Sequence, residues 1–439
     1  MTFFFETYGC QMNTAESAAM ELAARERGWE KAESAPADLV LLNSCSVRET
    51  AETRFRGRLA HYQALKKKGR PFTLVAAGCA ASRLGKKLKE EFPALDYVMG
   101  ASARSLFPLI LEAVERGRPL EPGEETPAWC FAPSHFEEGA FRSFIPITHG
   151  CDNFCSYCVV PYARGREVCR SPAAILAELR LLAEKGVREI TLLGQNVNSY
   201  QHEGDTASPG VLDFPGLLTL IAREIRGTSI RWVRFLSANP KDLSPRTIEV
   251  LAENPCFCRH IHLPAQHGSN RILGAMNRRY TRESYLALVR DLRRALPGLS
   301  LSTDIMVGFP GETGEDMEDL LSLMEEVRFH YAYMYHYNPR EGTAAWGFPG
   351  RVPEKVKRRR LSQVIALQKQ HTLQLLQDRV GARETVLIEG ISRKNADELV
   401  ARTEKDEMAV FPGAREAIGS FTEVTFISLR GNTFRAERA

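Results

Sequence analysis

The sequence predicts an α/β protein built from three successive units: an N-terminal parallel sheet, a central domain of six strand–helix units and a small C-terminal β-barrel. Short apolar runs alternate with helix-length segments over residues 1–116 and again over 142–350. This alternation is typical of parallel sheets with helices on both faces. From about residue 378 the pattern changes to short strand-like runs separated by turn residues, which favours a small barrel. Residues 117–141 are rich in proline and glutamate without periodicity and are expected to form a linker.

The composition indicates an ordinary globular protein. Of the 439 residues, 44% are hydrophobic and 26% are charged. No run approaches the roughly 18 apolar residues that a membrane span needs. The start, MTFFFETYGC, lacks the basic region and apolar core of a signal peptide, so we expect a cytoplasmic protein that does not contact a membrane. The net charge of +4 is compatible with a nucleic-acid partner without arguing for one.

The N-terminal unit is expected to contain three strands, each followed by a helix. The strands are expected over residues 3–9, 38–44 and 71–78, and the helices over 13–28, from about 47 and from about 82. Asn13 and Thr14 are expected to cap the first helix, with Glu16 and Glu21 favoured by the helix dipole.

The central unit is expected to contain six strands with helices between them. The strands are expected over residues 143–149, 188–194, 230–237, 259–265, 299–308 and 331–338. The helices are expected at roughly 171–185, 214–226, 244–253, 281–296 and 313–327. Six units are too few for a closed eightfold barrel, so a partial barrel or an open doubly wound sheet fits. A long helix is expected over 352–377, with Leu361, Val364 and Ile365 on one apolar face.

Three cysteines crowd into the stretch GCDNFCSYC after the first central strand. We call Cys151, Cys155 and Cys158 the central triad. In a reducing compartment, clustered cysteines usually indicate metal binding or catalysis rather than disulfides. Structural zinc prefers four ligands in two separated pairs, and buried packing cysteines would not favour so polar a loop. Three thiolates suit a [4Fe–4S] cluster with one iron left open.

Three further cysteines each follow one strand of the N-terminal unit. We call Cys10, Cys45 and Cys79 the N-terminal triad. Because the carboxyl ends of parallel strands meet at one edge of a sheet, these cysteines are expected to converge there. The alternative is that they only pack. If they bind a cluster, they again leave one iron open. The remaining cysteines are expected to pack or to lie at the surface: Cys130, Cys169, Cys256 and Cys258.

These motifs resemble those of a known enzyme superfamily. The C-x3-C-x2-C loop after the first strand of a six-unit α/β domain resembles the radical S-adenosylmethionine (SAM) superfamily. With a three-cysteine domain before it and a small barrel after it, the chain resembles the methylthiotransferases over nearly its whole length. TYGCQMNTAES and CDNFCSYCVVPYARGRE resemble the bacterial branch that acts on N6-isopentenyladenosine in tRNA. His267 and Ala163 depart from that pattern, where serine and threonine are commoner.

The resemblance implies a division into domains and a reaction. It implies an N-terminal methylthiotransferase domain over 1–116, a linker over 117–141, a radical SAM core with its trailing helix over 142–375 and an RNA-binding TRAM barrel over 376–439. The reaction adds a methylthio group to carbon 2 of N6-(dimethylallyl)adenosine at position 37, in the tRNA anticodon loop. SAM serves as methyl donor and radical source, and carbon 2 is unactivated, which is why a radical is needed.

The resemblance also implies cofactors and partners. It implies two [4Fe–4S] clusters, an auxiliary cluster on the N-terminal triad and a radical SAM cluster on the central triad, so that all six cysteines have catalytic roles. An external electron donor and a sulfur source are needed, and a monomer is expected. The alternatives are a methylthiotransferase for threonylcarbamoyladenosine tRNA or for ribosomal protein S12, and an RNA-binding iron–sulfur protein without catalysis.

Polar residues near the strand ends are expected to hold SAM. Gln195 and Asn196 follow the second central strand, and one residue is expected at each of the next three strand ends: Ser237, Gln266 and Asp304. Arg166 and Arg170 are further candidates for SAM or phosphate.

The tRNA substrate is expected to meet two further groups of residues. Aromatic residues are candidates for an apolar isopentenyl pocket: Tyr335, Tyr337 and Trp346. The basic run at 355–360 is a candidate for phosphate contacts. Because sulfur and radical act on one carbon, the edge of the N-terminal sheet must face the mouth of the central barrel.

Overall fold

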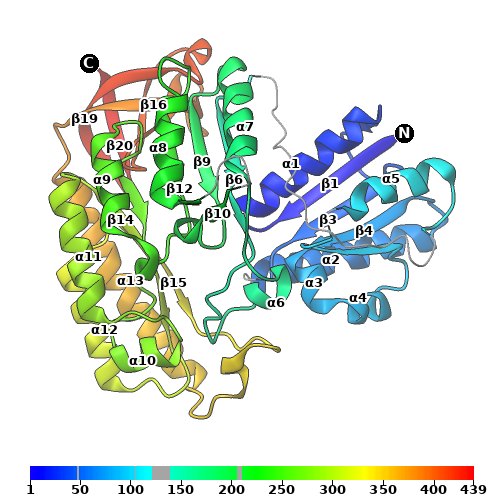
Figure 1. The fold of residues 1–439 in the computed structure, drawn as a ribbon, viewed down its shortest axis with the longest axis horizontal. Coiled ribbons are helices and arrows are strands. Elements are labelled where there is room, and N and C mark those ends of the chain that lie inside the picture. The colour runs from blue at the N-terminus through cyan, green and yellow to red at the C-terminus, as the bar shows by residue number, and fades with distance from the viewer. Residues whose placement is uncertain (47–48, 104, 121–138, 205–209) are drawn as a thin grey trace.

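The computed structural model describes residues 1–46, 49–103, 105–120, 139–204 and 210–439. Three units follow one another along the chain (Figure 1). Most of the expected linker, including Cys130, lies outside the described residues. Within the described residues, no helix is both long and apolar enough to cross a membrane.

The N-terminal unit is a five-stranded parallel sheet with helices on both faces. The strand order is β2-β1-β3-β4-β5. The strands are β1 (Thr2–Tyr8), β2 (Glu30–Lys31), β3 (Leu39–Ser44), β4 (Thr73–Gly78) and β5 (Tyr97–Gly100). The helices α1 (Gln11–Glu26) and α5 (Leu106–Arg116) cover one face. The other face is covered by α2 (Glu49–Lys67), α3 (Cys79–Leu84) and α4 (Lys86–Glu91). The three expected strands are confirmed, while β2, β5 and α5 were not foreseen.

The expected start of the first helix was wrong. Helix α1 begins at Gln11 directly after β1, with Cys10 at the cap position and no side-chain cap bond. Asn13 is fully buried inside the helix and donates from Nδ2 to Asn43 Oδ1 at 2.9 Å. The asparagine therefore joins α1 to β3 instead of capping the helix.

The central unit is a partial barrel of six parallel strands in sequential order. Two three-stranded sheets, β6-β9-β12 and β13-β14-β15, are joined by a bridge between Val233 and Phe257. The strands are β6 (Arg142–Pro146), β9 (Glu189–Leu193), β12 (Trp232–Phe235), β13 (His260–His262), β14 (Ser300–Val307) and β15 (Tyr331–His336). The sequential order excludes the doubly wound alternative and confirms all six expected strands.

Helices cover the outside of this partial barrel (Figure 1). They are α7 (Pro172–Glu184), α8 (Phe214–Glu224), α9 (Pro245–Glu253), α11 (Arg282–Ala295), α12 (Gly314–Val327) and α13 (Glu354–Gln377). Ser171, Ser244, Thr281 and Thr313 cap four of them by accepting a backbone N–H from the first turn. On α13, Val364 is buried but Ile365 is 44% exposed, so the expected apolar face is narrower than the sequence indicated.

Short elements lie in the loops of the central unit. They are β7 (Thr148–His149), α6 (Val160–Arg164), β8 (Val168–Cys169), β10 (Gln201–Glu203), β11 (Val211–Asp213) and α10 (Asn270–Ala275).

The C-terminal unit is a closed five-stranded barrel, as expected, with strand order β16-β17-β18-β20-β19. The strands are β16 (Arg383–Ile391), β17 (Glu398–Thr403), β18 (Met408–Pro412), β19 (Phe421–Arg430) and β20 (Thr433–Arg438). This barrel packs against the beginnings of the central strands. The rings of Trp232 and Phe421 lie 4.8 Å apart, and Arg402 forms a buried ion pair with Glu189 at 2.6 Å. It therefore closes the amino end of the partial barrel.

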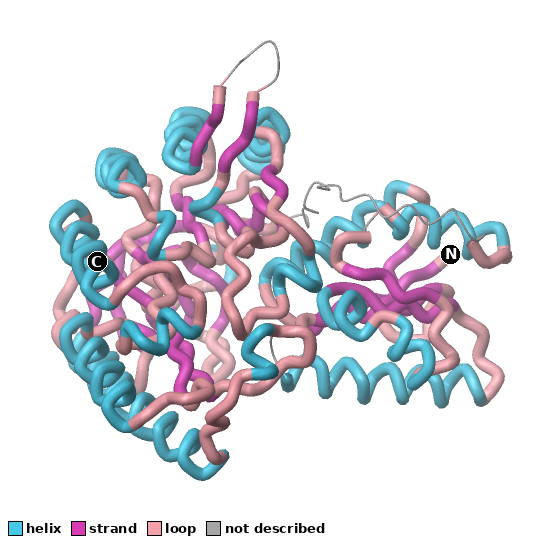
Figure 2. The backbone as a smooth tube through the Cα atoms, turned by 60° about the horizontal axis from the view of Figure 1, so that its bottom comes forward, coloured by secondary structure: helices cyan, strands magenta, loops and turns pink. Residues whose placement is uncertain are grey.

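The N-terminal unit sits at the opposite, carboxyl end. Met12 and Ala15 of α1 pack against Leu193 just at the end of β9, with Phe144 and Leu236 alongside. Figure 2 shows the N-terminal sheet as a separate lobe that meets the central unit at this edge. The expectation that the N-terminal sheet edge faces the barrel mouth is confirmed.

Candidate functional site

The central triad lies in the loop between β7 and α6. Cys151 and Cys155 are buried, and Cys158 is partly exposed. Gly150 has a φ of +79°, and a Cβ there would come within 2.0 Å of the Arg166 carbonyl oxygen, so only glycine fits this turn. The Gly150 N–H donates to Gln195 Oε1 at 2.6 Å, which ties the loop to the end of β9.

Each sulfur of the central triad accepts a hydrogen bond from an N–H donor. Asn153 Nδ2 donates to Cys151 at 3.4 Å, Val160 N to Cys158 at 3.5 Å, and Arg278 Nη1 to Cys155 at 3.4 Å. Burial nevertheless raises the pKa of Cys151 and raises that of Cys158 to about 12. A thiolate binds metal and a thiol does not, so the positive charge of bound iron would favour the ionised form here.

The N-terminal triad comes together at the carboxyl edge of its sheet. Cys10 precedes α1, Cys45 follows β3 and Cys79 begins α3. A hydrogen bond with Cys45 outweighs burial and lowers the pKa of Cys10 to about 6, and the charge of Arg164 adds to this effect. Burial raises the pKa of Cys79. The predicted convergence is therefore present in the fold.

Each triad consists of three thiols, which are the ligand type that holds iron–sulfur clusters. In the described part of the chain, no three His, Cys, Asp or Glu side chains are grouped to hold one metal ion. Cluster ligands need not meet at one point, because each thiolate binds a different iron. Three N–H···S contacts around the central triad are of the kind that tunes such clusters.

Arg164, at the end of α6, joins the central unit to the N-terminal triad. Its Nε donates to Cys79 Sγ at 3.0 Å, and its Nη1 pairs with Glu16 Oε1 at 2.6 Å. Both charged side chains are only 3% exposed. The neighbouring Ala163 packs against Cys79 and Ala101, so the departure at this position lies in the contact between the two units.

The residues expected to bind SAM follow the ends of the central strands, except Asp304, which lies within a strand. Asn196 is buried and donates to Asp242 Oδ2 at 2.7 Å. Ser237 and Gln266 both have a φ of +65°, a conformation that is costly for a non-glycine residue and is often found at functional sites. Asp304 does not end its strand: it lies within β14, where its Oδ2 is 3.4 Å from His262 Nε2. The expected placement of Asp304 at the strand end was wrong because β14 continues to Val307.

Other expected contacts turn out to be internal. Arg170 is buried against Glu178, whereas Arg166 is largely exposed. His267 is buried, with Nε2 3.5 Å from Glu312 Oε2, so this departure from the family pattern belongs to the core. Tyr337 is also buried, which leaves only Tyr335 and Trp346 exposed among the three pocket candidates.

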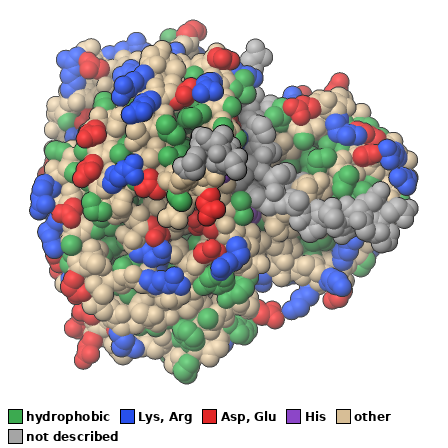
Figure 3. All heavy atoms as spheres, viewed as in Figure 1, with side chains coloured by type: hydrophobic (Ala, Val, Ile, Leu, Met, Phe, Trp, Pro, Cys, Tyr) green, Lys and Arg blue, Asp and Glu red, His purple; other side chains and the backbone are tan. Residues whose placement is uncertain are grey.

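The basic run at the start of α13 contains both buried and exposed side chains. Lys357 is buried and donates to the Tyr337 carbonyl at 2.9 Å, and Arg360 is buried against Glu312 at 2.8 Å. The exposed members form what we call the α13 basic patch: Lys355, Arg358 and Arg359. On the face shown in Figure 3, basic and acidic side chains are interspersed over the described surface.

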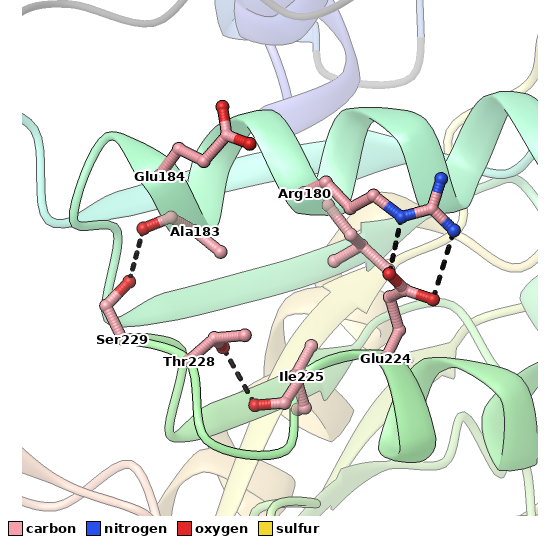
Figure 4. Close-up of a pocket in the computed structure, with 8 residues that line it drawn as sticks. Arg180, Ala183, Glu184, Glu224, Ile225, Thr228 and Ser229 are labelled. Atoms are coloured by element: carbon pink, nitrogen blue, oxygen red, sulfur yellow. Dashed lines mark hydrogen bonds and ion pairs between the residues drawn. The ribbon is translucent and has the colours of Figure 1, made fainter.

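Two hollows on the outer surface of the described residues do not coincide with the triads. One, of about 310 Å³, lies between α7 and α8, where Arg180 pairs with Glu224 at its rim (Figure 4). The other, of about 420 Å³, is lined by residues that include Trp232 and Cys256 at the amino end of the barrel. The chemistry of the triads, and not cavity size, locates the candidate site.

Sequence reasoning missed two buried arginines, Arg164 and Arg278. Arg164 stands in the same motif as the central triad, which was the available signal. Arg278 lies more than 100 residues from Cys155 in sequence, and only the fold brings them together.

Three family models match the chain. The model described as "Radical SAM superfamily" matches residues 145–324, "Uncharacterized protein family UPF0004" matches 2–100, and "TRAM domain" matches 377–437. The chain is therefore a radical SAM enzyme that uses SAM and a [4Fe–4S] cluster. It belongs to the family of the tRNA-2-methylthio-N(6)-dimethylallyladenosine synthases.

The relatives resemble the chain over its whole length. The proteins of that name from Treponema pallidum (strain Nichols) and Treponema denticola are 49% and 47% identical, and each match covers 99% of this chain and 98% and 99% of the relative. The protein from Geobacter sulfurreducens is 42% identical over 99% of this chain and 96% of its own. The solved radical SAM methyltransferase TsrM from Kitasatospora setae shares the fold, with a TM-score of 0.62 at 16% identity over 79% of this chain and 77% of its own.

Proposed function

We propose that this protein converts N6-(dimethylallyl)adenosine at position 37 of tRNA to its 2-methylthio derivative. The observation that carries the proposal is that Arg164, from the sequence motif of the central triad, contacts Cys79 of the N-terminal triad at 3.0 Å. A reaction that brings sulfur and a radical to one carbon needs two such centres facing each other. We assign the N-terminal triad, the central triad and RNA binding to three separate domains. Their proposed limits are 1–116, 142–375 and 376–439.

The central triad is proposed to hold the cluster that works with SAM. When bound there, the cluster would supply one-electron reduction of SAM. Gln195 orients the triad loop through Gly150, and Asn153 and Arg278 donate N–H groups to the sulfurs. Asn196, Ser237 and Gln266 follow the ends of central strands, whereas Asp304 lies within β14, and all four are proposed to bind SAM.

The N-terminal triad is proposed to hold the second cluster, which carries the transferred sulfur. The contact of Met12 and Ala15 with Leu193 excludes water beside this site. Exclusion of water protects a reactive radical from side reactions. An external reductant and a sulfur source remain part of the proposal, as does a monomeric state.

The substrate base must leave the anticodon-loop stack to reach this interface. Single-stranded loops permit this at modest cost. Tyr335 and Trp346, both 44% exposed, are proposed to contact the isopentenyl group. Trp346 is held near the central triad because its neighbour Ala345 donates its backbone N–H to the Ser156 carbonyl at 2.7 Å. Burying a methylene-sized unit is worth about 0.8 kcal/mol, so five carbons can contribute about 4 kcal/mol.

The substrate assay offers the enzyme tRNA with unmodified, isopentenylated or threonylcarbamoylated adenosine 37. Methylthio product is expected mainly from the isopentenylated tRNA, because an apolar contact rejects the charged threonylcarbamoyl group. Equal activity on unmodified tRNA, or a preference for the threonylcarbamoylated form, would contradict the substrate assignment. The same assay with dithionite and SAM should release 5′-deoxyadenosine, which an RNA-binding protein without catalysis would not produce.

Iron analysis tests the two clusters. Two [4Fe–4S] clusters predict about eight irons per chain. Replacing the central triad with alanine should halve the iron and abolish SAM cleavage. Replacing the N-terminal triad should halve the iron but leave SAM cleavage, with no methylthio product. Full retention of iron in either variant would remove that triad from the proposal.

A further inference from the structure

Arg164 belongs to the central unit by sequence, but its side chain contacts residues of the N-terminal unit. It ends α6, in the motif that carries the central triad. Its Nε nevertheless donates to Cys79 Sγ at 3.0 Å, and its Nη1 meets Glu16 of α1 at 2.6 Å. It thus reaches a proposed cluster ligand across the boundary between the two units.

The guanidinium has one donor left over. Nη1 also lies 3.4 Å from His149 Nδ1, so Nε and Nη1 both have partners. Among the described residues, Nη2 is buried and meets no acceptor. A buried donor without an acceptor costs free energy, on the order of 1–3 kcal/mol. A cluster held by the N-terminal triad would supply anionic sulfur acceptors beside this guanidinium, which already contacts Cys79.

We propose that Arg164 is a positioning residue that raises the reduction potential of the auxiliary cluster from across the domain boundary. The inference rests on the proposed cluster at the N-terminal triad. A nearby positive charge and an N–H···S bond both favour the more negative, reduced form of an iron–sulfur cluster. Glu16 holds the guanidinium in place, so the cluster has its full electronic environment only when the two units are docked.

The central triad offers an internal comparison. Arg278 donates to Cys155 Sγ at 3.4 Å and belongs to the same unit as that triad. Each triad thus has its own arginine. A change at Arg164 should therefore alter one cluster and leave the other unchanged.

The experiment measures the midpoint potential of each cluster separately in full-length protein. The reference for the auxiliary cluster is the chain with the central triad replaced by alanine. In this background, Arg164→Gln and Arg164→Lys are compared with Arg180→Gln, an arginine on the surface of α7 paired with Glu224. Iron content and a potentiometric titration followed by electron paramagnetic resonance are recorded for each variant.

A lower midpoint potential is expected for Arg164→Gln and a smaller decrease for Arg164→Lys, because lysine keeps the charge but not the planar set of donors. Arg180→Gln should match the reference. The double variant Arg164→Met with Glu16→Leu removes both charges of the buried pair, which is often neutral for folding. Because the two charges act on Cys79 in opposite directions, the decrease in this variant should be smaller than in Arg164→Gln and should reflect the lost N–H···S bond. In the converse background, with the N-terminal triad replaced, the same double variant should leave the potential of the central cluster unchanged.

An auxiliary cluster that keeps its iron and its midpoint potential in Arg164→Gln would overturn the inference. Equal shifts in both clusters would also overturn it, since they would indicate a global change. If the reference chain binds no cluster, the proposed auxiliary centre itself is wrong, and this result is separate from a bound cluster whose potential does not move.

Discussion

Replacing Glu16 with alanine should loosen the contact between the N-terminal and central units. Glu16 and Arg164 are both 3% exposed and 2.6 Å apart, so the substitution leaves a buried guanidinium without its carboxylate. Breaking a buried ion pair by removing one partner costs about 3–5 kcal/mol. At about 1.4 kcal/mol for each factor of ten, the population of the opened interface should rise by about a hundredfold or more.

The matched control is the surface pair between Arg180 and Glu224 (Figure 4). Its shortest N···O distance, 2.5 Å, is nearly the same, but its side chains are 58% and 25% exposed. Water and ions screen such a pair, and its contribution is about 0–1 kcal/mol. Glu224→Ala should therefore have little effect, so the two variants compare burial at nearly constant distance.

Hydrogen–deuterium exchange provides the measurement. Amides of α1 and α6 should exchange much faster in Glu16→Ala than in the unmodified protein, while amides around α7 and α8 should hardly change in Glu224→Ala. The double variant Glu16→Leu with Arg164→Met should restore slow exchange, because it leaves no unpaired charge. Equal small effects of Glu16→Ala and Glu224→Ala, each in its own neighbourhood, would refute the argument that burial decides the strength of the pair.

Three further predictions concern tRNA binding, substrate choice and pH. Neutralising the α13 basic patch should reduce the slope of log Kd for tRNA against log salt concentration by roughly 0.7–0.9 per lost phosphate contact. Arg294→Gln on α11 should leave this slope unchanged. An unchanged slope in the patch variant would show that the patch does not contact tRNA phosphates. Trp346→Ala should lower kcat/KM for isopentenylated tRNA by about tenfold, equivalent to about 1.4 kcal/mol. The same variant should hardly change kcat/KM for unmodified tRNA. An equal loss on both substrates would argue against an isopentenyl pocket at Trp346. Burial lowers the pKa of His260 to about 3, so the folded protein binds fewer protons than the unfolded chain below about pH 6.5. The free energy of unfolding should consequently fall with decreasing pH by up to about 1.4 kcal/mol per unit, and urea unfolding of His260→Gln should show a weaker pH dependence. Identical pH dependence in both proteins would contradict the neutral state of this histidine.

The C-terminal barrel cannot be removed without exposing part of the central unit. Trp232 and Glu189 of the central barrel are buried against it. Truncation would expose both, so loss of activity would not report on tRNA. Substitutions in the α13 basic patch avoid this problem.

The order of the main elements could be predicted because it depends on local patterns. The expected strand over 299–308 corresponds to β14, Ser300–Val307, since its apolar residues are bounded by turn residues on both sides. In contrast, β2 consists of Glu30–Lys31, two exposed polar residues that become a strand only by pairing with β1. No periodicity within so short a segment could have shown this.

The class of the protein, the two cysteine triads and the parallel strands that carry them follow from local sequence patterns. The spacing of Cys151, Cys155 and Cys158 is local, and the positions of Cys10, Cys45 and Cys79 after strands place them at one edge for any parallel sheet. Which charged side chains contact the triads depends on how distant segments pack in the fold. In a run such as KVKRRR every residue looks alike, yet Lys357 is buried and Lys355 is exposed. The difference arises from contacts between segments distant in the chain, and the same long-range packing brings Arg164 from the loop of one triad to the sulfur of the other.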